Sequence, residues 1–118
     1  MSDCEAIMQF VYPKEAVESF DIDYLITTHM PLVEKHFKPI GLKSWFISQP
    51  TEDPGFIPRE TKDHGYFCQC ILIWESEKKM REAFASPRAM GPVMDDVKNF
   101  TDGKGRSDLW FGLITAKK

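Results

Sequence analysis

The sequence predicts a single α+β domain over residues 1–118, and three observations support this fold class. Four short segments are apolar and rich in β-branched and aromatic residues, which is typical of strands. Segments with apolar residues at helical spacing separate the first strand from the second and the third from the fourth. The order is therefore strand, helix, strand, strand, helix pair, strand. This is the split βαβ arrangement of the ferredoxin-like fold, in which helices cover one face of a four-stranded antiparallel sheet.

The first strand and the first helix are predicted within residues 6–41. Residues 6–12 form an apolar, β-prone run that ends before Pro13, which predicts a strand. Asp21 is a suitable N-cap for the helix that follows, because its carboxylate can accept hydrogen bonds from free backbone N–H groups. Pro39 and Gly41 end this helix, since proline cannot continue the hydrogen-bond ladder and glycine favours the position after a helix.

A histidine is predicted to lie on the buried side of this helix. At about 100° per residue, Leu25, His29, Leu32 and His36 fall on one stripe, so His29 is expected to face whatever the helix packs on. Pro31 has no N–H to donate and crowds the carbonyl four residues before it, so it is expected to kink the helix beside His29. The two residues together predict a pocket.

A long polar connection separates the next two strands. Residues 43–49 are predicted as the second strand, and residues 50–64, with their prolines and charges, as the segment most able to move. Residues 65–74 are predicted as the third strand. Because this strand is apolar at both odd and even positions apart from Gln69, both of its faces are expected to be covered.

Two helices and a strand complete the domain. Ser76 and Ser86 each precede a segment of helical spacing and are suitable N-caps, and Pro87 stands at a first helical position. Residues 108–115 are predicted as the closing strand. The residues predicted to face inward from the two helices are Met80, Ala83, Phe84, Met90, Val93, Met94 and Val97.

The apolar strands also predict a homodimer. Strands that are apolar on both sides need cover on both faces of the sheet, yet the predicted helices cover only one. A second copy of the chain is therefore expected to pack its sheet back to back against the first around a two-fold axis. The ligand pocket would then lie between helices and sheet within each protomer.

Composition narrows the range of partners. The formal net charge of -3 argues against nucleic acid or an anionic membrane, and the 42% hydrophobic and 13% aromatic content favours a folded domain with a small, hydrophobic ligand. No apolar run is long enough to cross a bilayer and no signal-peptide pattern is present, so a cytoplasmic location is expected. Cys4, Cys68 and Cys70 are an odd number without metal-ligand spacing, which predicts neither a disulfide framework nor a metal site.

Several blocks of the sequence carry a resemblance to a known family. They are Phe20-Asp21-x-Asp23-Tyr24, His29-Met30-Pro31-Leu32-Val33, Gly41-Leu42-Lys43, Ala85-Ser86-Pro87 and Asp96-Val97-x-Asn99-Phe100-Thr101. These blocks resemble the EthD family of dimeric α+β barrel proteins, and the likeness extends from about Tyr12 to Thr101. The resemblance implies a dimeric α+β barrel that uses no metal or cofactor.

What the resemblance implies about chemistry is a choice among several activities. Proteins of this fold family include ether-degradation accessories, muconolactone isomerases, and dehydratase-like or cyclase-like proteins of aromatic polyketide pathways. In members that look enzymatic, a helix histidine matching His29 serves as the proton-transfer residue, and the aromatic residue of the second strand, here Trp45, lines the pocket. The central strand of this chain has no second histidine, so a partner for His29 is expected from elsewhere.

The candidate catalytic residues are His29 and His64. An imidazole titrates near neutral pH and can take a proton beside a carbonyl and return it to a leaving hydroxyl, which suits His29. The alternative is a core histidine bonded to a backbone carbonyl. His64 stands just before the third strand, where it either closes over the pocket as a second proton carrier or simply begins the strand.

The candidate substrate-binding residues are Thr28, Trp45, Phe46 and Tyr66. The aromatic side chains of the sequence offer more area than a small core needs, which favours a flat apolar ligand, although most must serve the core or the dimer interface. A hydroxyl or the freed backbone carbonyl near Thr27 or Thr28 is expected to orient a reaction intermediate. Tyr66 is the phenol expected to meet a ligand carbonyl, whereas Tyr12 and Tyr24 are interpreted as half-buried packing.

Asp95 and Asp96 are interpreted as part of a solvated helix face. Adjacent residues on a helix diverge, and no third ligand is evident, so the two carboxylates do not predict a metal site. Asp96 is expected to tie down the turn formed by residues 99–101.

The leading hypothesis is a cofactor-free acid/base enzyme of the dehydratase, cyclase or isomerase type. It would act on a small hydrophobic aromatic or polyketide-like carbonyl compound, with His29 as the proton-transfer residue. Two alternatives stay open: a non-catalytic binding or accessory protein for a hydrophobic metabolite, and a cofactorless monooxygenase of the same fold. Replacement of His29 by Ala separates catalysis from binding, and consumption of O₂ separates oxygenation from dehydration.

Overall fold

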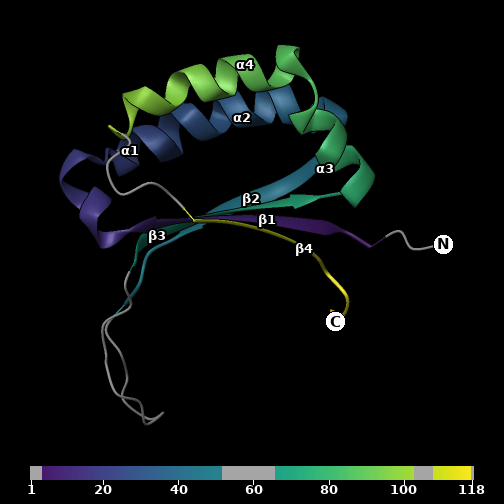
Figure 1. Cartoon of the computed structure of the whole chain (residues 1–118), viewed down its shortest axis with the longest axis horizontal. Coiled ribbons are helices and arrows are strands. Elements are labelled where there is room, and N and C mark those ends of the chain that lie inside the picture. Colours follow the sequence, from purple (N-terminus) through teal and green to yellow (C-terminus); the bar gives the residue numbers. More distant parts are fainter. Residues whose placement is uncertain (1–3, 52–65, 103–107, 118) are drawn as a thin grey trace, which may run out of the picture.

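A computed structural model describes residues 4–51, 66–102 and 108–117 of the chain. Figure 1 shows two layers, in which the helices lie over one face of a single sheet. The strands are β1 (Ala6–Pro13), β2 (Leu42–Ser48), β3 (Tyr66–Trp74) and β4 (Asp108–Leu113). The helical segments are η1 (Lys14–Ser19), α1 (Ile22–Tyr24), η2 (Leu25–His29), α2 (Met30–Phe37), η3 (Lys38–Ile40), α3 (Glu77–Phe84), α4 (Pro87–Asp96) and η4 (Val97–Asn99).

The sheet has the strand order β2-β3-β1-β4, and every neighbouring pair is antiparallel. This is the α+β, ferredoxin-like arrangement, so the predicted fold class is confirmed. The strands begin and end within a residue or two of their predicted bounds; the largest difference is at β4, which stops at Leu113. Most of the predicted polar connection, including His64, lies outside the described residues, as do residues 103–107.

The predicted first helix is three successive helical segments, α1, η2 and α2, rather than one kinked helix. The middle segment, η2, is a π-helix, in which the backbone N–H of Met30 donates to the carbonyl of Leu25, five residues earlier. Pro31 follows at once, in the first turn of α2, where an N–H is not needed. A kink was expected at Pro31, and the structure instead has a wider, π-helical turn just before the proline.

The π-helical turn changes which residues of this region face the sheet. The prediction that His29 points inward is confirmed, because the residue is only 5% exposed. The predicted stripe does not continue through Leu32 and His36, however, since both are half-buried. Val33 and Phe37 are buried in their place. The wide turn adds a residue to the helix, and the buried face downstream moves by about one position.

The predicted N-caps are confirmed. The side chains of Asp21, Ser76 and Ser86 each accept a hydrogen bond from the backbone N–H three residues further on, at 2.9, 3.2 and 3.3 Å respectively. The chain leaves η3 through Gly41, which has a φ of 134°. A Cβ at this position would lie 2.7 Å from a side-chain carbon of Lys79, so a larger residue would also collide with α3.

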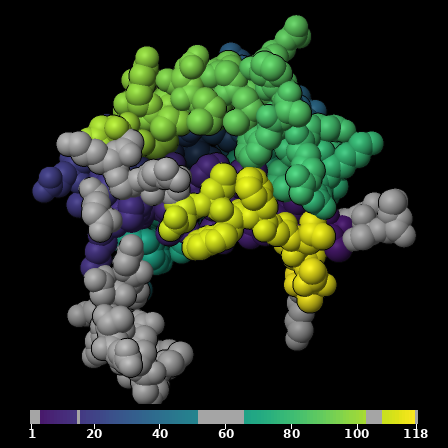
Figure 2. Space-filling view, viewed as in Figure 1, coloured from purple at the N-terminus to yellow at the C-terminus, as the bar shows by residue number. Residues whose placement is uncertain are grey.

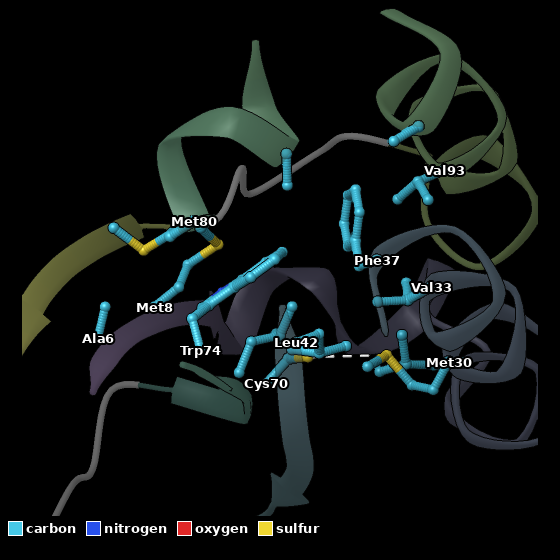
Figure 3. Packing of buried hydrophobic residues seen from close by; sticks show 14 of the residues in the cluster. Ala6, Met8, Met30, Val33, Phe37, Leu42, Cys70, Trp74, Met80 and Val93 are labelled. Carbon is cyan, nitrogen blue, oxygen red and sulfur yellow. Dashed lines mark hydrogen bonds between the residues drawn. The ribbon is translucent and has the colours of Figure 1, made fainter. Parts of the chain in front are cut away.

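The core lies between the helices and the face of the sheet that they cover (Figure 3). Trp74 of β3 and Phe37 of α2 are both buried there, with ring centroids 5.3 Å apart. Cys68 and Cys70 are also buried, as predicted for small core residues, and the Sγ atom of Cys70 lies 3.8 Å from the Sδ atom of Met30.

The opposite face of the sheet carries none of the helices that the structure describes (Figure 1). Strand pairing places large apolar side chains on it, and Phe46 of β2 and Trp110 of β4 are 50% and 56% exposed. The other apolar residues on this outer face are Ile7, Val11, Ile71 and Ile73. The expectation of apolar residues on both faces is therefore confirmed.

No helix within the described residues combines the length and the apolar character needed to span a bilayer.

Candidate functional site

A cavity of about 430 Å³ lies between the covered face of the sheet and the helices. Strands β1, β3 and β4 line one side of it, and η2, α2 and α4 line the other. Its walls are mostly aliphatic, aromatic and methionine side chains. Among the described residues that line it, the side chains that carry an oxygen or a nitrogen are those of Tyr12, His29 and Thr101. The site is therefore an apolar cavity with few polar groups, the general form of a small-molecule pocket.

The cavity reaches the surface between α4 and β4. Met94 of α4 and Leu109 and Phe111 of β4 all line it and are all strongly exposed. Figure 2 shows the hollow between the pale green atoms of α4 and the yellow atoms of β4. The described residues at this opening, Met94, Leu109 and Phe111, are apolar.

His29 and Asp96 form a pair at the helix side of the cavity. The Nδ1 atom of His29 lies 2.9 Å from Oδ2 of Asp96. The histidine belongs to the π-helix η2, and the aspartate is the last residue of α4, which lies beside α2 above the sheet (Figure 1). The wide turn of η2 brings the imidazole inward at the point where α4 ends.

Two further side chains hold the other oxygen of Asp96. The Tyr24 hydroxyl donates to Oδ1 at 2.6 Å, and Nδ2 of Asn99 donates to the same atom at 2.8 Å. Burial works to raise the pKa of Asp96, but the hydrogen bonds from Tyr24, Asn99 and His29 outweigh it and leave the pKa below its usual value. The carboxylate is therefore ionised at neutral pH.

This arrangement fixes the tautomer of His29. An ionised carboxylate can only accept hydrogen bonds, so Nδ1 of His29 carries the proton and donates it to Asp96. Burial lowers the pKa of His29 and outweighs the opposing effect of the Asp96 carboxylate, so the ring is neutral at pH 7. Its Nε2 atom then has a free lone pair, and no described residue donates to it.

Phe100 supports the imidazole from one side. Its ring centroid lies 4.6 Å from that of His29, and the phenylalanine is buried. Phe100 directly follows η4, the turn that Asn99 ties to Asp96. One short segment at the end of α4 therefore supplies the carboxylate, a hydrogen bond that holds it and the aromatic surface beside the histidine.

The interpretation of Asp96 as a solvated residue is wrong. Its side chain is mostly buried, because the end of α4 packs over η2 and places the carboxylate against His29. The expected tie to the following turn is confirmed by the bond from Asn99. Tyr24 is half-buried, as expected, but its hydroxyl also holds Asp96.

The family resemblance could have pointed to this network. Asp96, Asn99 and Phe100 stand together in one of the blocks quoted for the family resemblance, and Tyr24 stands in another. Helical spacing alone could not join them to His29, because the contact depends on how α4 crosses η2.

Of the other predicted site residues that the structure describes, none lines the cavity. Thr28 is exposed on η2, and Phe46 is exposed on the outer face of the sheet. Trp45 is half-buried, and its Nε1–H donates to Oε1 of Glu34 at 2.6 Å. Tyr66 is half-buried at the start of β3.

No group of three or more histidine, cysteine, aspartate or glutamate side chains in the described ranges is arranged to hold a metal ion.

Comparisons with known proteins agree with this fold. The chain is similar to an EthD-like protein from Ralstonia eutropha JMP134, with a TM-score of 0.75 and 17% identity over 99% of this chain and 97% of that one. It is also similar to SnoaB of Streptomyces nogalater, a cofactor-independent oxygenase, with a TM-score of 0.52 and 15% identity over 99% and 96% of the two chains. A dimeric ferredoxin-like protein from an uncultured marine organism gives a TM-score of 0.56 and 8% identity over 99% and 92%.

Among curated proteins, no sequence matches this chain. The family model described as the EthD domain matches residues 13–104, which is most of the chain and includes His29, Asp96 and the side chains that hold Asp96. The chain therefore belongs to the EthD domain family.

Proposed function

We propose that this protein is a cofactor-free acid/base enzyme that acts on a small hydrophobic carbonyl compound, with His29 as the proton-transfer residue. One observation carries the proposal. A neutral imidazole, held through Nδ1 by an ionised carboxylate, lines an apolar cavity while its Nε2 atom has no partner among the described residues. This is the arrangement of a general base with an orienting group behind it.

The chemistry follows from the free lone pair. Nε2 of His29 takes a proton from the carbon beside the substrate's carbonyl, and the electron pair of the broken C–H bond moves toward the carbonyl oxygen. In an elimination, the imidazolium then gives this proton to a hydroxyl on the next carbon, which leaves as water while a C=C bond forms. In an isomerisation, the same proton returns to a different carbon. Asp96 stabilises the imidazolium between the two steps.

The cavity favours a neutral and largely apolar substrate. Its volume of about 430 Å³ is within the range of small-molecule sites. No lysine or arginine is among the described residues that line the cavity, and these residues would offer an anionic substrate no counter-charge for its lost hydration. Acid/base assistance supplies about 10²- to 10⁴-fold, which suits a substrate whose C–H bond is already activated by a carbonyl or an aromatic ring.

Hydrogen exchange on a model ketone tests the proposal. The neutral aromatic ketone 2-tetralone carries acidic C–H bonds beside its carbonyl, and their replacement by deuterium in D₂O can be followed by NMR. The protein is expected to accelerate this exchange above the buffer rate, and His29→Ala is expected to remove the acceleration. His36→Ala is the matched control, because His36 lies on the adjoining α2 but does not line the cavity.

The outcomes separate the competing functions. Equal exchange with the wild-type protein and with His29→Ala would overturn the proposal. Binding of 2-tetralone without accelerated exchange would instead support a carrier of hydrophobic metabolites. Because SnoaB is a cofactor-independent oxygenase, the same samples are also placed in an oxygen electrode with a phenol, and O₂ consumption would assign the chain to oxygenation.

We also propose that the protein is a homodimer whose sheets pack back to back. The support is the apolar outer face, on which Phe46 and Trp110 are half exposed, together with the similarity to a dimeric ferredoxin-like protein. Exposed apolar side chains on one face of a sheet are typical of an interaction site, and burial gains about 25 cal/mol per Å² of apolar surface.

A further inference from the structure

Tyr12 lines the same cavity as the proposed catalytic histidine but has no part in its network. It is near the end of β1, where its register partner on β3 is Cys68. Both residues lie on the face of the sheet that the helices cover, and the tyrosine lines the cavity. The π-helix that carries His29 lies on the opposite wall. The cavity therefore separates a phenol on the sheet from an imidazole on the helices.

The hydroxyl of Tyr12 has no hydrogen-bond partner within the described part of the chain. The hydroxyl is therefore available to a bound molecule, and a ligand acceptor in an otherwise apolar cavity would gain a hydrogen bond from it. Burial also raises the pKa of Tyr12 well above its ordinary value. The group therefore stays a neutral phenol, able to donate a hydrogen bond but not to act as a base.

The positions of Tyr12 and His29 are linked by a shared neighbour. The ring centroid of Phe100 lies 4.6 Å from that of His29 and 6.2 Å from that of Tyr12. Both polar side chains therefore meet the cavity at its Phe100 end. The thiol of Cys70, which also lines the cavity, does not compete as a nucleophile, because burial raises its pKa to about 12.

We propose that the hydroxyl of Tyr12 is a second catalytic group, which donates a hydrogen bond to the carbonyl oxygen of the substrate while His29 removes the neighbouring proton. The inference rests on the proposed function and narrows its substrate class to neutral ketones and aldehydes with a C–H bond beside the carbonyl. Such a molecule presents one acceptor to Tyr12 and one acidic C–H bond to His29, and its remaining surface is apolar like the walls.

The hydrogen bond matters most in the transition state. When the C–H bond breaks, its proton moves to Nε2 of His29 and its electron pair produces an enolate, with negative charge on the oxygen that faces Tyr12. The phenol keeps its own proton throughout and stabilises this charge through a stronger hydrogen bond. When His29 returns the proton, the charge disappears and both residues are in their starting states.

Binding of 2-naphthol tests the inference without any turnover. This planar molecule has the shape of the enol of 2-tetralone, and its hydroxyl can donate to Nε2 of His29 while accepting from Tyr12. Loss of one hydrogen bond of this kind is expected to weaken binding by roughly 2- to 12-fold in Tyr12→Phe. Naphthalene is the matched control, because it fills the cavity without a hydroxyl, and its affinity should be unchanged if the variant is folded.

A second measurement uses the wild-type protein alone. The ¹³Cζ NMR signal of Tyr12 is expected to shift further when 2-naphthol is added than with naphthalene, whose ring current acts without a hydrogen bond. Equal affinity of 2-naphthol for Tyr12→Phe and the wild type, or a Tyr12 signal that on saturation moves no further with 2-naphthol than with naphthalene, would overturn the inference.

Exchange on 2-tetralone separates this inference from the proposed function. If the proposed function and the role of Tyr12 are both right, Tyr12→Phe slows deuterium exchange on 2-tetralone at least several-fold, and His29→Ala abolishes the acceleration. If His29→Ala abolishes it and Tyr12→Phe does not change it, only the role of Tyr12 is wrong. If neither variant differs from the wild type, the proposed function itself fails.

Discussion

At the scale of single residues, the account depends on how one imidazole is protonated. His29 has two ring nitrogens, and the structure gives one of them to Asp96 and leaves the other without a partner among the described residues. Tyr24 and Asn99 hold the carboxylate, so that the ring is oriented by a network rather than by one bond. Loss of any one of these hydrogen bonds is expected to let the imidazole ring of His29 adopt other orientations.

Asp96→Asn tests this orientation. An asparagine amide can donate to Nδ1 of His29, which would move the ring proton to Nε2 and leave no lone pair for the substrate. Exchange on 2-tetralone is expected to fall about 10²- to 10⁴-fold, since the base is lost while the cavity keeps its shape. Asp95→Asn is the control, because Asp95 is exposed and does not line the cavity. Equal effects of the two substitutions would contradict the role of Asp96.

The burial of His29 predicts how stability depends on pH. Its pKa is lower in the folded protein than the ordinary value near 6.5, so below that pH the unfolded chain binds a proton that the folded chain does not. The free energy of unfolding should therefore be fully retained above pH 6.5 and should fall on acidification, by at most about 1.4 kcal/mol per pH unit from this group.

Urea denaturation at pH 7 and pH 5 measures this contribution. His29→Gln is expected to lose less stability between the two pH values than the wild type, whereas His36→Gln is expected to behave like the wild type. A wild-type protein and a His29→Gln variant with the same pH dependence would show that the histidine is not held neutral by burial.

Sequence reasoning identified His29 but not the residues behind it. The spacing of Leu25 and His29 was enough to predict an inward imidazole, because both lie on one short helical segment. Asp96 and Tyr12 come from elements distant in the sequence, and their contacts depend on how the helices cross the sheet. The predicted roles of Trp45, Phe46, Tyr66, Thr28 and His64 stay predictions.

At the scale of elements, the π-helical turn is the feature that periodicity could not predict. A regular helix would have continued the buried stripe through Leu32 and His36, whereas the wide turn of η2 moves burial to Val33 and Phe37. Turns of this kind often occur at functional sites, and here the turn ends on His29. Caps were predictable because they depend only on neighbouring residues.

Ser86→Ala tests the contribution of a cap to the helix that carries Asp96. The Ser86 hydroxyl accepts a hydrogen bond from the N–H of Ala89 at the start of α4, and its loss is expected to lower the free energy of unfolding by about 1 kcal/mol. Glu82→Ala is the control, because Glu82 is exposed on α3 rather than on the sheet and caps no helix. An equal loss in both variants, measured by urea denaturation, would show that the cap contributes nothing specific.

At the scale of the whole molecule, the two faces of the sheet have different roles. One face of the sheet holds the core and the cavity beneath the helices. The other face presents apolar side chains, and no helix within the described residues covers them. The alternation along the strands predicted both faces, because adjacent strand residues point to opposite sides. It could not predict what lies against the outer face, so the homodimer and the cytoplasmic location stay predictions.

Trp110→Glu tests the dimer. The wild-type protein is expected to have twice the 13.6 kDa mass of one chain at micromolar concentration, and a charge on the outer face at this position of β4 should convert it to a monomer. Val17→Glu is the control, because Val17 is also a strongly exposed apolar residue but lies on η1 rather than on the sheet. Light scattering after size exclusion gives the mass, and a monomeric wild-type protein would contradict the proposal.

The most direct test of the central claim is the protonation of His29 in the wild-type protein. A two-dimensional ¹H–¹⁵N spectrum of the histidine rings reports which nitrogen carries the proton and, when recorded across a pH titration, the pKa. The account predicts a neutral ring at pH 7 with the proton on Nδ1, a free Nε2, and a pKa below 6.5. A positively charged ring at pH 7, or a proton on Nε2, would contradict it.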